Sequence, residues 1–112
     1  MTTPIVSVRG RIGGIYQGFA YERLTITTAA ATGLTSTVFA PADTARAQSA
    51  IVTVENSDVR YRYDGSSPTS TDGSKLYEDG VLTLMGYHNI NQCEFINVGT
   101  TTDASVVVSY ER

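Results

Sequence analysis

Apolar residues recur at every second position over most of this chain. Alternation of this kind places successive side chains on opposite faces of a strand, and no window sustains a helical period of about 3.6 residues. The pattern predicts an all-β protein, because short strands at regular spacing with turn residues between them are typical of that class. The predicted strands span 5–8, 20–27, 35–39, 50–55, 59–63, 81–84, 93–98 and 105–110.

The segments between these strands carry specific turn signals. Asn56-Ser57-Asp58 predicts a tight hairpin joining strands 50–55 and 59–63, because Asn and Asp tolerate left-handed backbone. Glu78-Asp79-Gly80 predicts a second turn, in which the glycine is free to take a positive φ. Residues 65–74 predict a surface loop. Residues 41–47 favour about one helical turn with Asp43 as its N-cap.

The number of strands and the length predict one architecture. Eight short strands in 112 residues suit an antiparallel two-sheet sandwich that is jelly-roll-like. Strand 50–55 is apolar on both faces, which predicts a cover on each side. Glycines at positions 10, 13, 14 and 18 predict an extended, flexible N-terminal arm. The predicted organisation is therefore an arm over 1–17 and a single sandwich domain over 18–112.

Composition narrows the possible partners and compartments. The net charge is −3, and Lys75 is the only lysine, so a phosphate-binding face is not expected and nucleic acid is not a predicted partner. Cys93 is the single cysteine, which excludes an internal disulfide framework. No apolar run is long enough to span a bilayer, and the first residues lack a signal-peptide pattern. Synthesis in a reducing cytoplasm is expected.

Catalytic and metal-binding patterns are weak. His88 is the single histidine and lies in a predicted turn, and no nucleophile-elbow pattern is present. Cys93 is predicted to be a small buried side chain. Acidic residues flank the long loop, but the twelve-residue calcium pattern is missing, and the GRIGG run at 10–14 lacks the lysine of a phosphate-binding loop. We expect a non-enzymatic protein without metal or cofactor.

Tyrosine and arginine suggest contact surfaces. Tyr77 and Tyr87 lie near loops, where tyrosine is either an interface residue or an ordinary strand residue, whereas Tyr61 and Tyr63 are expected in the core. Arg60 and Arg62 should share one strand face about 7 Å apart, so either Glu or Asp residues of neighbouring strands or a partner should accept them. The residues predicted to bind a partner are Arg9, Arg11, Ile12, Ile15, Tyr16, Arg60, Arg62, Tyr77 and Tyr87.

Residues 45–112 carry a wider similarity. A strand ending in Arg60-Tyr61-Arg62-Tyr63-Asp64-Gly65 precedes a Ser/Thr/Pro loop with Pro68-Thr69, then the Glu-Asp-Gly turn and a Val-rich closing strand that ends near Tyr110-Glu111. In this order the chain resembles the small β-sandwich decoration, or cement, proteins on the heads of tailed bacteriophages. Tail and head-completion proteins of such phages have similar sequence features.

The resemblance implies a virion structural protein. It implies binding to the outside of the assembled major capsid protein lattice, stabilisation of the head, self-association as a homodimer, and a final location on the capsid surface after synthesis in the bacterial host. It implies no enzyme activity and no nucleic acid, membrane or small-molecule substrate. The alternative is a tail component or a receptor- or carbohydrate-binding β-sandwich, which would show a shallow groove of exposed aromatic residues. Tryptophan, the usual stacking residue in such grooves, is absent.

Overall fold

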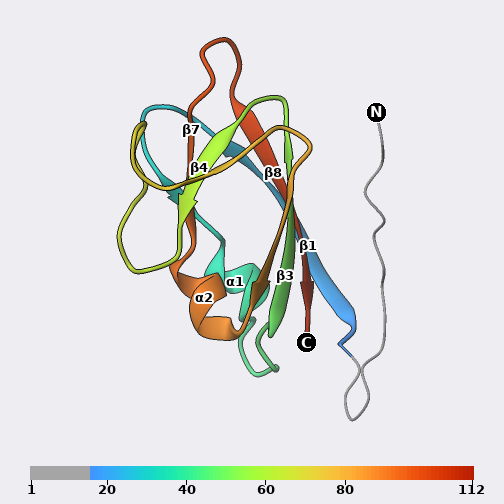
Figure 1. Ribbon diagram of the computed structural model, residues 1–112. Helices are drawn as coiled ribbons and strands as arrows, with labels where there is room; N and C mark the ends of the chain where they lie inside the picture. Colours follow the sequence, from blue (N-terminus) through green and yellow to red (C-terminus); the bar gives the residue numbers. More distant parts are fainter. Residues whose placement is uncertain (1–15) are drawn as a thin grey trace.

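The protein is a sandwich of two four-stranded antiparallel sheets, in a computed structural model that describes residues 16–112 (Figure 1). The sheet that we call the long sheet has the order β1-β8-β3-β6, from β1 (Gly18–Ile26), β8 (Ala104–Glu111), β3 (Ser49–Glu55) and β6 (Val81–Met85). The short sheet has the order β2-β7-β4-β5, from β2 (Thr32–Gly33), β7 (Glu94–Asn97), β4 (Val59–Arg62) and β5 (Ser74–Leu76). Two short helices, α1 (Ser36–Phe39) and α2 (Tyr87–Gln92), lie at one end.

The strand order is that of a jelly roll. Every connection between successive strands of the described chain crosses from one sheet to the other except the β4–β5 connection, which stays within the short sheet. Eight strands arranged in this way form two interlocked Greek keys. The structure therefore confirms the predicted antiparallel, jelly-roll-like two-sheet sandwich.

The core lies between the inward faces of the two sheets. Val52 and Val54 of β3 and Val106 and Val108 of β8 alternate with outward residues and are fully buried. The short sheet contributes Val59 and Phe95 from the opposite side. Burying each such side chain stabilises the fold by about 1.5–3 kcal/mol, so these strands hold the sheets together.

Six of the predicted strands are confirmed, as β1, β3, β4, β6, β7 and β8. The strand predicted over 35–39 is wrong, because Ser36–Phe39 form the helical turn α1. This turn buries Phe39 against the rings of Tyr87 and Tyr110, at centroid distances of 5.9 and 5.8 Å. Burial of one large ring thus overrides the strand preference of neighbouring Thr37 and Val38.

Two predicted turns differ in the structure. The hairpin predicted at Asn56-Ser57-Asp58 is wrong, because β3 and β4 belong to different sheets. Asn56 does take left-handed backbone, with φ 75°, but the bend it makes crosses the sandwich. In the turn at 78–80, Asp79 rather than Gly80 has the positive φ, at 68°.

Two helix assignments also change. Residues 41–47 form no helix, because Asp43 has φ 63° and so cannot take the extended conformation of an N-cap. The predicted turn around His88 is instead α2. The predicted loop is confirmed as irregular chain over 63–73.

The described chain begins beside its C-terminal end. Gln17 and Arg112 exchange two backbone hydrogen bonds of 3.0 Å, which extend the β1–β8 pairing by one residue. The predicted strand 5–8 and the rest of the predicted arm up to residue 15 lie outside the described residues.

Candidate binding surfaces

The predicted partner-binding residues are dispersed. Arg9, Arg11, Ile12 and Ile15 lie outside the described residues, and Tyr16 is half-buried where the description begins. Arg60 and Arg62 are on β4, Tyr77 follows β5 and Tyr87 begins α2. Apart from the neighbouring arginines of β4, these positions belong to separate elements, and their role in binding a partner remains a prediction.

Arg60 holds the long loop against the short sheet. Its Nη1 donates to the carbonyl oxygen of Gly73 at 2.8 Å, and its Nε donates to that of Ser70 at 3.3 Å. Pro68, in the same loop, is buried. Since the guanidinium is already occupied by carbonyls of its own chain, Arg60 has a fold-stabilising role in this structure.

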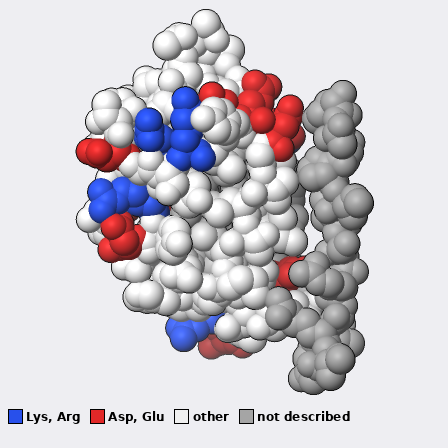
Figure 2. All heavy atoms as spheres, in the orientation of Figure 1, with Lys and Arg blue, Asp and Glu red and all other residues white. Residues whose placement is uncertain are grey.

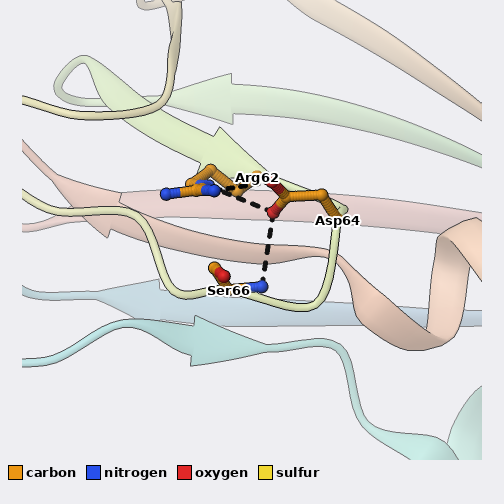
Figure 3. Close-up of polar contacts among 3 residues, drawn as sticks. All are labelled: Arg62, Asp64 and Ser66. Carbon is orange, nitrogen blue, oxygen red and sulfur yellow. Dashed lines mark hydrogen bonds and ion pairs between the residues drawn. The ribbon is translucent and has the colours of Figure 1, made fainter.

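Arg62 is paired with a carboxylate at the start of the loop (Figure 3). Its Nε donates to Asp64 Oδ1 at 3.0 Å and its Nη2 to Asp64 Oδ2 at 2.6 Å, while the Ser66 backbone N–H also donates to Oδ1 at 3.3 Å. The hydrogen bond from Arg62 and that from Ser66 lower the pKa of Asp64, so the carboxylate stays ionised. The predicted acceptor of Arg62 is a carboxylate of a neighbouring strand or of a partner, whereas in the structure the carboxylate is that of Asp64, two residues further along the chain.

An aromatic ladder leads from the core to this pair. Tyr61 lies against Phe95, and the ring of Tyr63 is stacked on that of Tyr61, with 6.3 Å between centroids in each case and 17° between the two tyrosine planes. Tyr63 follows the last paired residue of β4 and is 47% exposed. The expectation that Tyr63 is a core residue is therefore wrong, whereas Tyr61 packs against the core.

An open hollow lies at this end of β4. Its volume is about 270 Å³, and its lining consists of Tyr61, Arg62, Tyr63, Asp64, Gly73 and Ser74. Gly73 has φ +126°, and a Cβ there would lie 3.1 Å from the Tyr61 carbonyl oxygen. A glycine is thus required where the returning loop meets β4.

The two other tyrosines have different environments. Tyr77 is 63% exposed, with Lys75 Nζ 5.2 Å from its ring centroid. Tyr87 is half-buried between the ring of Phe39 and the guanidinium of Arg46, which lies 3.8 Å above its ring centroid. Tyr77 therefore has the accessibility of a contact residue, whereas Tyr87 mainly packs α2 onto the sandwich.

The outward face of the long sheet is a second surface. Adjacent strands align there in rows, with Tyr21 beside Ser109, Ile51 and Thr83 in succession. Tyr21, Val81 and Met85 are 58%, 39% and 41% exposed. The remaining outward positions are Arg23, Thr25, Thr53, Glu55, Ser105, Val107 and Glu111. The predicted cover on both sides of strand 50–55 is wrong, since only its Val52 and Val54 face is buried.

The charged residues of this outward face are Arg23, Glu55 and Glu111. Arg23 Nη1 lies 2.7 Å from Glu55 Oε1, so the pair adds no net charge. More generally, the side of the molecule in Figure 2 is mostly uncharged, and its Lys and Arg groups lie beside Asp or Glu groups. One sequence signal could have revealed this surface. Ile51 and Val107 are apolar, yet the alternation along their strands places them on the outward face rather than in the core.

The residues considered for chemistry have structural settings. His88 is exposed on α2, with its Nε2 2.9 Å from Gln92 Nε2. Cys93 is buried as predicted, and burial raises the pKa of its thiol to about 12. Tyr110 is buried with its hydroxyl donating to Glu22, and burial above all raises the pKa of that hydroxyl. Within residues 16–112, no three His, Cys, Asp or Glu side chains gather where they could hold a metal ion.

Comparison with models of known protein families, with curated protein sequences and with solved structures gives no match. In the described part of the chain, no helix is long and apolar enough to cross a membrane.

Proposed function

We propose that this protein is a virion structural protein that decorates the outside of a tailed-phage capsid and stabilises the assembled lattice. The observation that carries the proposal is the outward face of the long sheet, where Tyr21, Val81 and Met85 are exposed among short Ser, Thr and Val side chains. The pairing of Arg23 with Glu55 lowers the cost of removing these two charges from water on contact. A protein surface of matching shape is the partner that this face suits best.

The size of the face favours a partner that offers many equivalent sites. Four strands about 4.8 Å apart, with roughly seven residues each at 3.4 Å, give a planar area of roughly 400 Å². A stable pairwise interface buries about 800 Å² on each partner. One such contact is therefore weak, and a lattice that is bound by many copies gains stability from the sum of these contacts.

Other parts of the proposal come from the resemblance of the sequence to phage decoration proteins. The predicted arm, with Arg9, Arg11, Ile12 and Ile15, would add contact area beyond the sheet. A homodimer would present the same lattice-binding face twice and so bridge neighbouring capsid subunits. The jelly-roll fold is used by viral capsid proteins and by lectins alike, so the fold supports the proposal without selecting it.

The test is cosedimentation of the purified chain with heads of its own phage that lack it, followed by counting the copies bound per head. Saturation at several hundred copies, with raised heat resistance of the heads, is the expected result. Saturation at about a dozen copies would instead identify a vertex or tail component, which is the alternative function. Absence of binding would refute the capsid role and favour the receptor- or carbohydrate-binding alternative, which glycan arrays would then test.

Paired variants locate the contact. Tyr21→Glu places a new charge on the edge strand β1 of the outward face and should weaken head binding by at least about tenfold, equivalent to about 1.4 kcal/mol. Asn91→Asp places a carboxylate at an exposed position of α2 and should leave binding unchanged. Equal effects of the two variants would mean that the long sheet is not the docking face.

A further inference from the structure

The hollow at the end of β4 combines three features that recognise one class of ligand. It has an exposed aromatic ring in Tyr63, an ion pair in Arg62 and Asp64, and a volume of about 270 Å³. Small-molecule pockets usually measure about 300–1,000 Å³. The hollow is therefore large enough for a ligand about the size of one ring, and the rest of a larger molecule would extend into solvent.

The ring of Tyr63 is a fixed stacking surface. It stands beyond the last residue of β4 that pairs with β7, and its neighbour Tyr61 holds it nearly parallel through the aromatic ladder. Tyr61 is anchored in turn against Phe95, which is fully buried. An exposed ring that is held in this way loses little side-chain entropy when a ligand lies on it.

The ion pair selects for hydroxyl groups. Arg62 uses Nε and Nη2 for Asp64, so Nη1 is left as a donor, and the Asp64 side chain is 59% exposed and retains acceptor positions. Figure 3 shows a terminal nitrogen of Arg62 directed away from the carboxylate. A donor and an acceptor side by side can bind two adjacent hydroxyl groups, one accepting from Arg62 and the other donating to Asp64.

The pairing of Arg62 with Asp64 disfavours ionic ligands. Asp64 would repel an anion that approached Arg62, and Arg62 would repel a cation that approached Asp64. A neutral ring with an apolar face and adjacent hydroxyls meets neither penalty. We propose that this hollow binds one ring of an uncharged saccharide, stacked on Tyr63 and hydrogen-bonded to Arg62 and Asp64. This assignment does not depend on the proposed capsid role.

The test is titration of the isotopically labelled full chain with methyl glycosides of glucose, galactose, mannose and N-acetylglucosamine, followed by NMR. At least one glycoside should bind with a millimolar Kd and shift the amide signals of Tyr63, Asp64, Gly73 and Ser74. Glucuronate and glucosamine supply an anionic and a cationic ring for comparison, and each should bind more weakly than its neutral counterpart.

Variants connect binding to the hollow. Tyr63→Ala should weaken the Kd by at least about tenfold, equivalent to about 1.4 kcal/mol, and Asp64→Asn should also weaken it, which provides a second measurement if the first variant does not fold. Tyr77→Ala removes another exposed tyrosine, which lies outside the hollow, and should leave the Kd unchanged. The assignment is overturned if no neutral glycoside binds, if only the charged rings bind, or if neither hollow variant weakens binding.

Discussion

Asn97 shows how single residues fix the end of the sandwich opposite the helices. Its side-chain carbonyl accepts from Ser57 Oγ at 2.9 Å and from the Gly99 backbone N–H at 2.8 Å, and its amide donates to the Thr102 carbonyl at 2.8 Å. The side chain is fully buried. A buried amide with these partners joins the bend after β3 to the loop after β7, and leaving it unpaired would cost about 1–3 kcal/mol.

Gly99 makes this cluster possible, and its substitution should be costly. A Cβ at position 99 would overlap Ser57 Oγ and lie 3.3 Å from Asn97 Oδ1. We expect Gly99→Ala to lower the free energy of unfolding by about 1–3 kcal/mol, as overpacking does, measured by urea denaturation. Gly33→Ala is the control, because its Cβ would meet neighbours at ordinary distances of 3.6 Å or more. If Gly99→Ala lowers the free energy of unfolding no more than Gly33→Ala does, close packing at Gly99 is not required for this cluster.

Two buried acids make the fold sensitive to alkali. The pKa of Cys93 is raised from 9.0 to about 12, and the pKa of Tyr110 is raised above 10.0, mainly by burial in both cases. The folded chain therefore holds both protons more tightly than the unfolded chain does. The contribution of Cys93 to stability is complete below pH 9.0 and that of Tyr110 below pH 10.0, and each is lost as the pH rises further, by up to about 1.4 kcal/mol per pH unit.

Urea midpoints measured at neutral pH and at pH 9, pH 10 and pH 11 test this, with the decline expected to begin at the ordinary thiol pKa of 9.0 and to steepen above the ordinary tyrosine pKa of 10.0. Cys93→Ala should remove the thiol's share of the decline while the share from Tyr110 persists. A stability that is constant across this range would contradict the burial of both groups.

At the scale of elements, side chains of β4 and β7 hold the long loop between β4 and β5 in place. Arg60 donates to two loop carbonyls, and Ser67 Oγ donates to Glu94 Oε1 of β7 at 2.7 Å. The loop thus lies over the outward side of the short sheet, where Pro68 is buried. This cover gives the short sheet a protected face, whereas Tyr21, Val81 and Met85 are exposed on the outward face of the long sheet.

Removing the Arg60 contacts should release the loop. Arg60→Met leaves the carbonyls of Ser70 and Gly73 without this donor, so amide hydrogen exchange across 64–73 should become faster and stability should fall by about 1–2 kcal/mol. Arg62→Met is the matched control, because its exposed ion pair is worth at most about 1 kcal/mol. If amide hydrogen exchange across 64–73 is equally fast in both variants, Arg60 does not hold the loop.

Period-two alternation was sufficient to locate the longer strands but not their partners. The bend at Asn56 has the chemistry of a hairpin turn, yet β3 pairs with β6 and β8 because their apolar faces complete the same layer. β2 and β5, of two and three residues, are too short to show a period. The hollow was not predicted, because the exposure of Tyr63 depends on where its neighbouring strands stop.

At the scale of the whole molecule, β8 is the strand on which the long sheet depends. It pairs with β1 on one side and with β3 on the other, over almost its full length. It also supplies four fully buried core residues, which are Ala104, Val106, Val108 and Tyr110. Among the strands of residues 16–112, β8 is the only neighbour of β1 in the long sheet.

A chain that ends at Asp103 should therefore be unfolded. Circular dichroism should show no cooperative thermal transition, because the two halves of the long sheet can no longer join. A chain that lacks only Arg112 keeps all of β8 and should unfold cooperatively. A cooperative transition in the shorter chain would show that the short sheet and β3–β6 form a stable unit by themselves.

The central place of β8 also sets when folding can occur in the cell. Of the strands that the structure describes, it is the last to leave the ribosome, whereas its partner β1 is the first. The long sheet cannot close before β8 has been synthesised, and the apolar faces of β1 and β3 stay open to solvent until then. Nascent chains of this protein should therefore associate with chaperones up to that point, and a stalled ribosome should carry a protease-sensitive polypeptide.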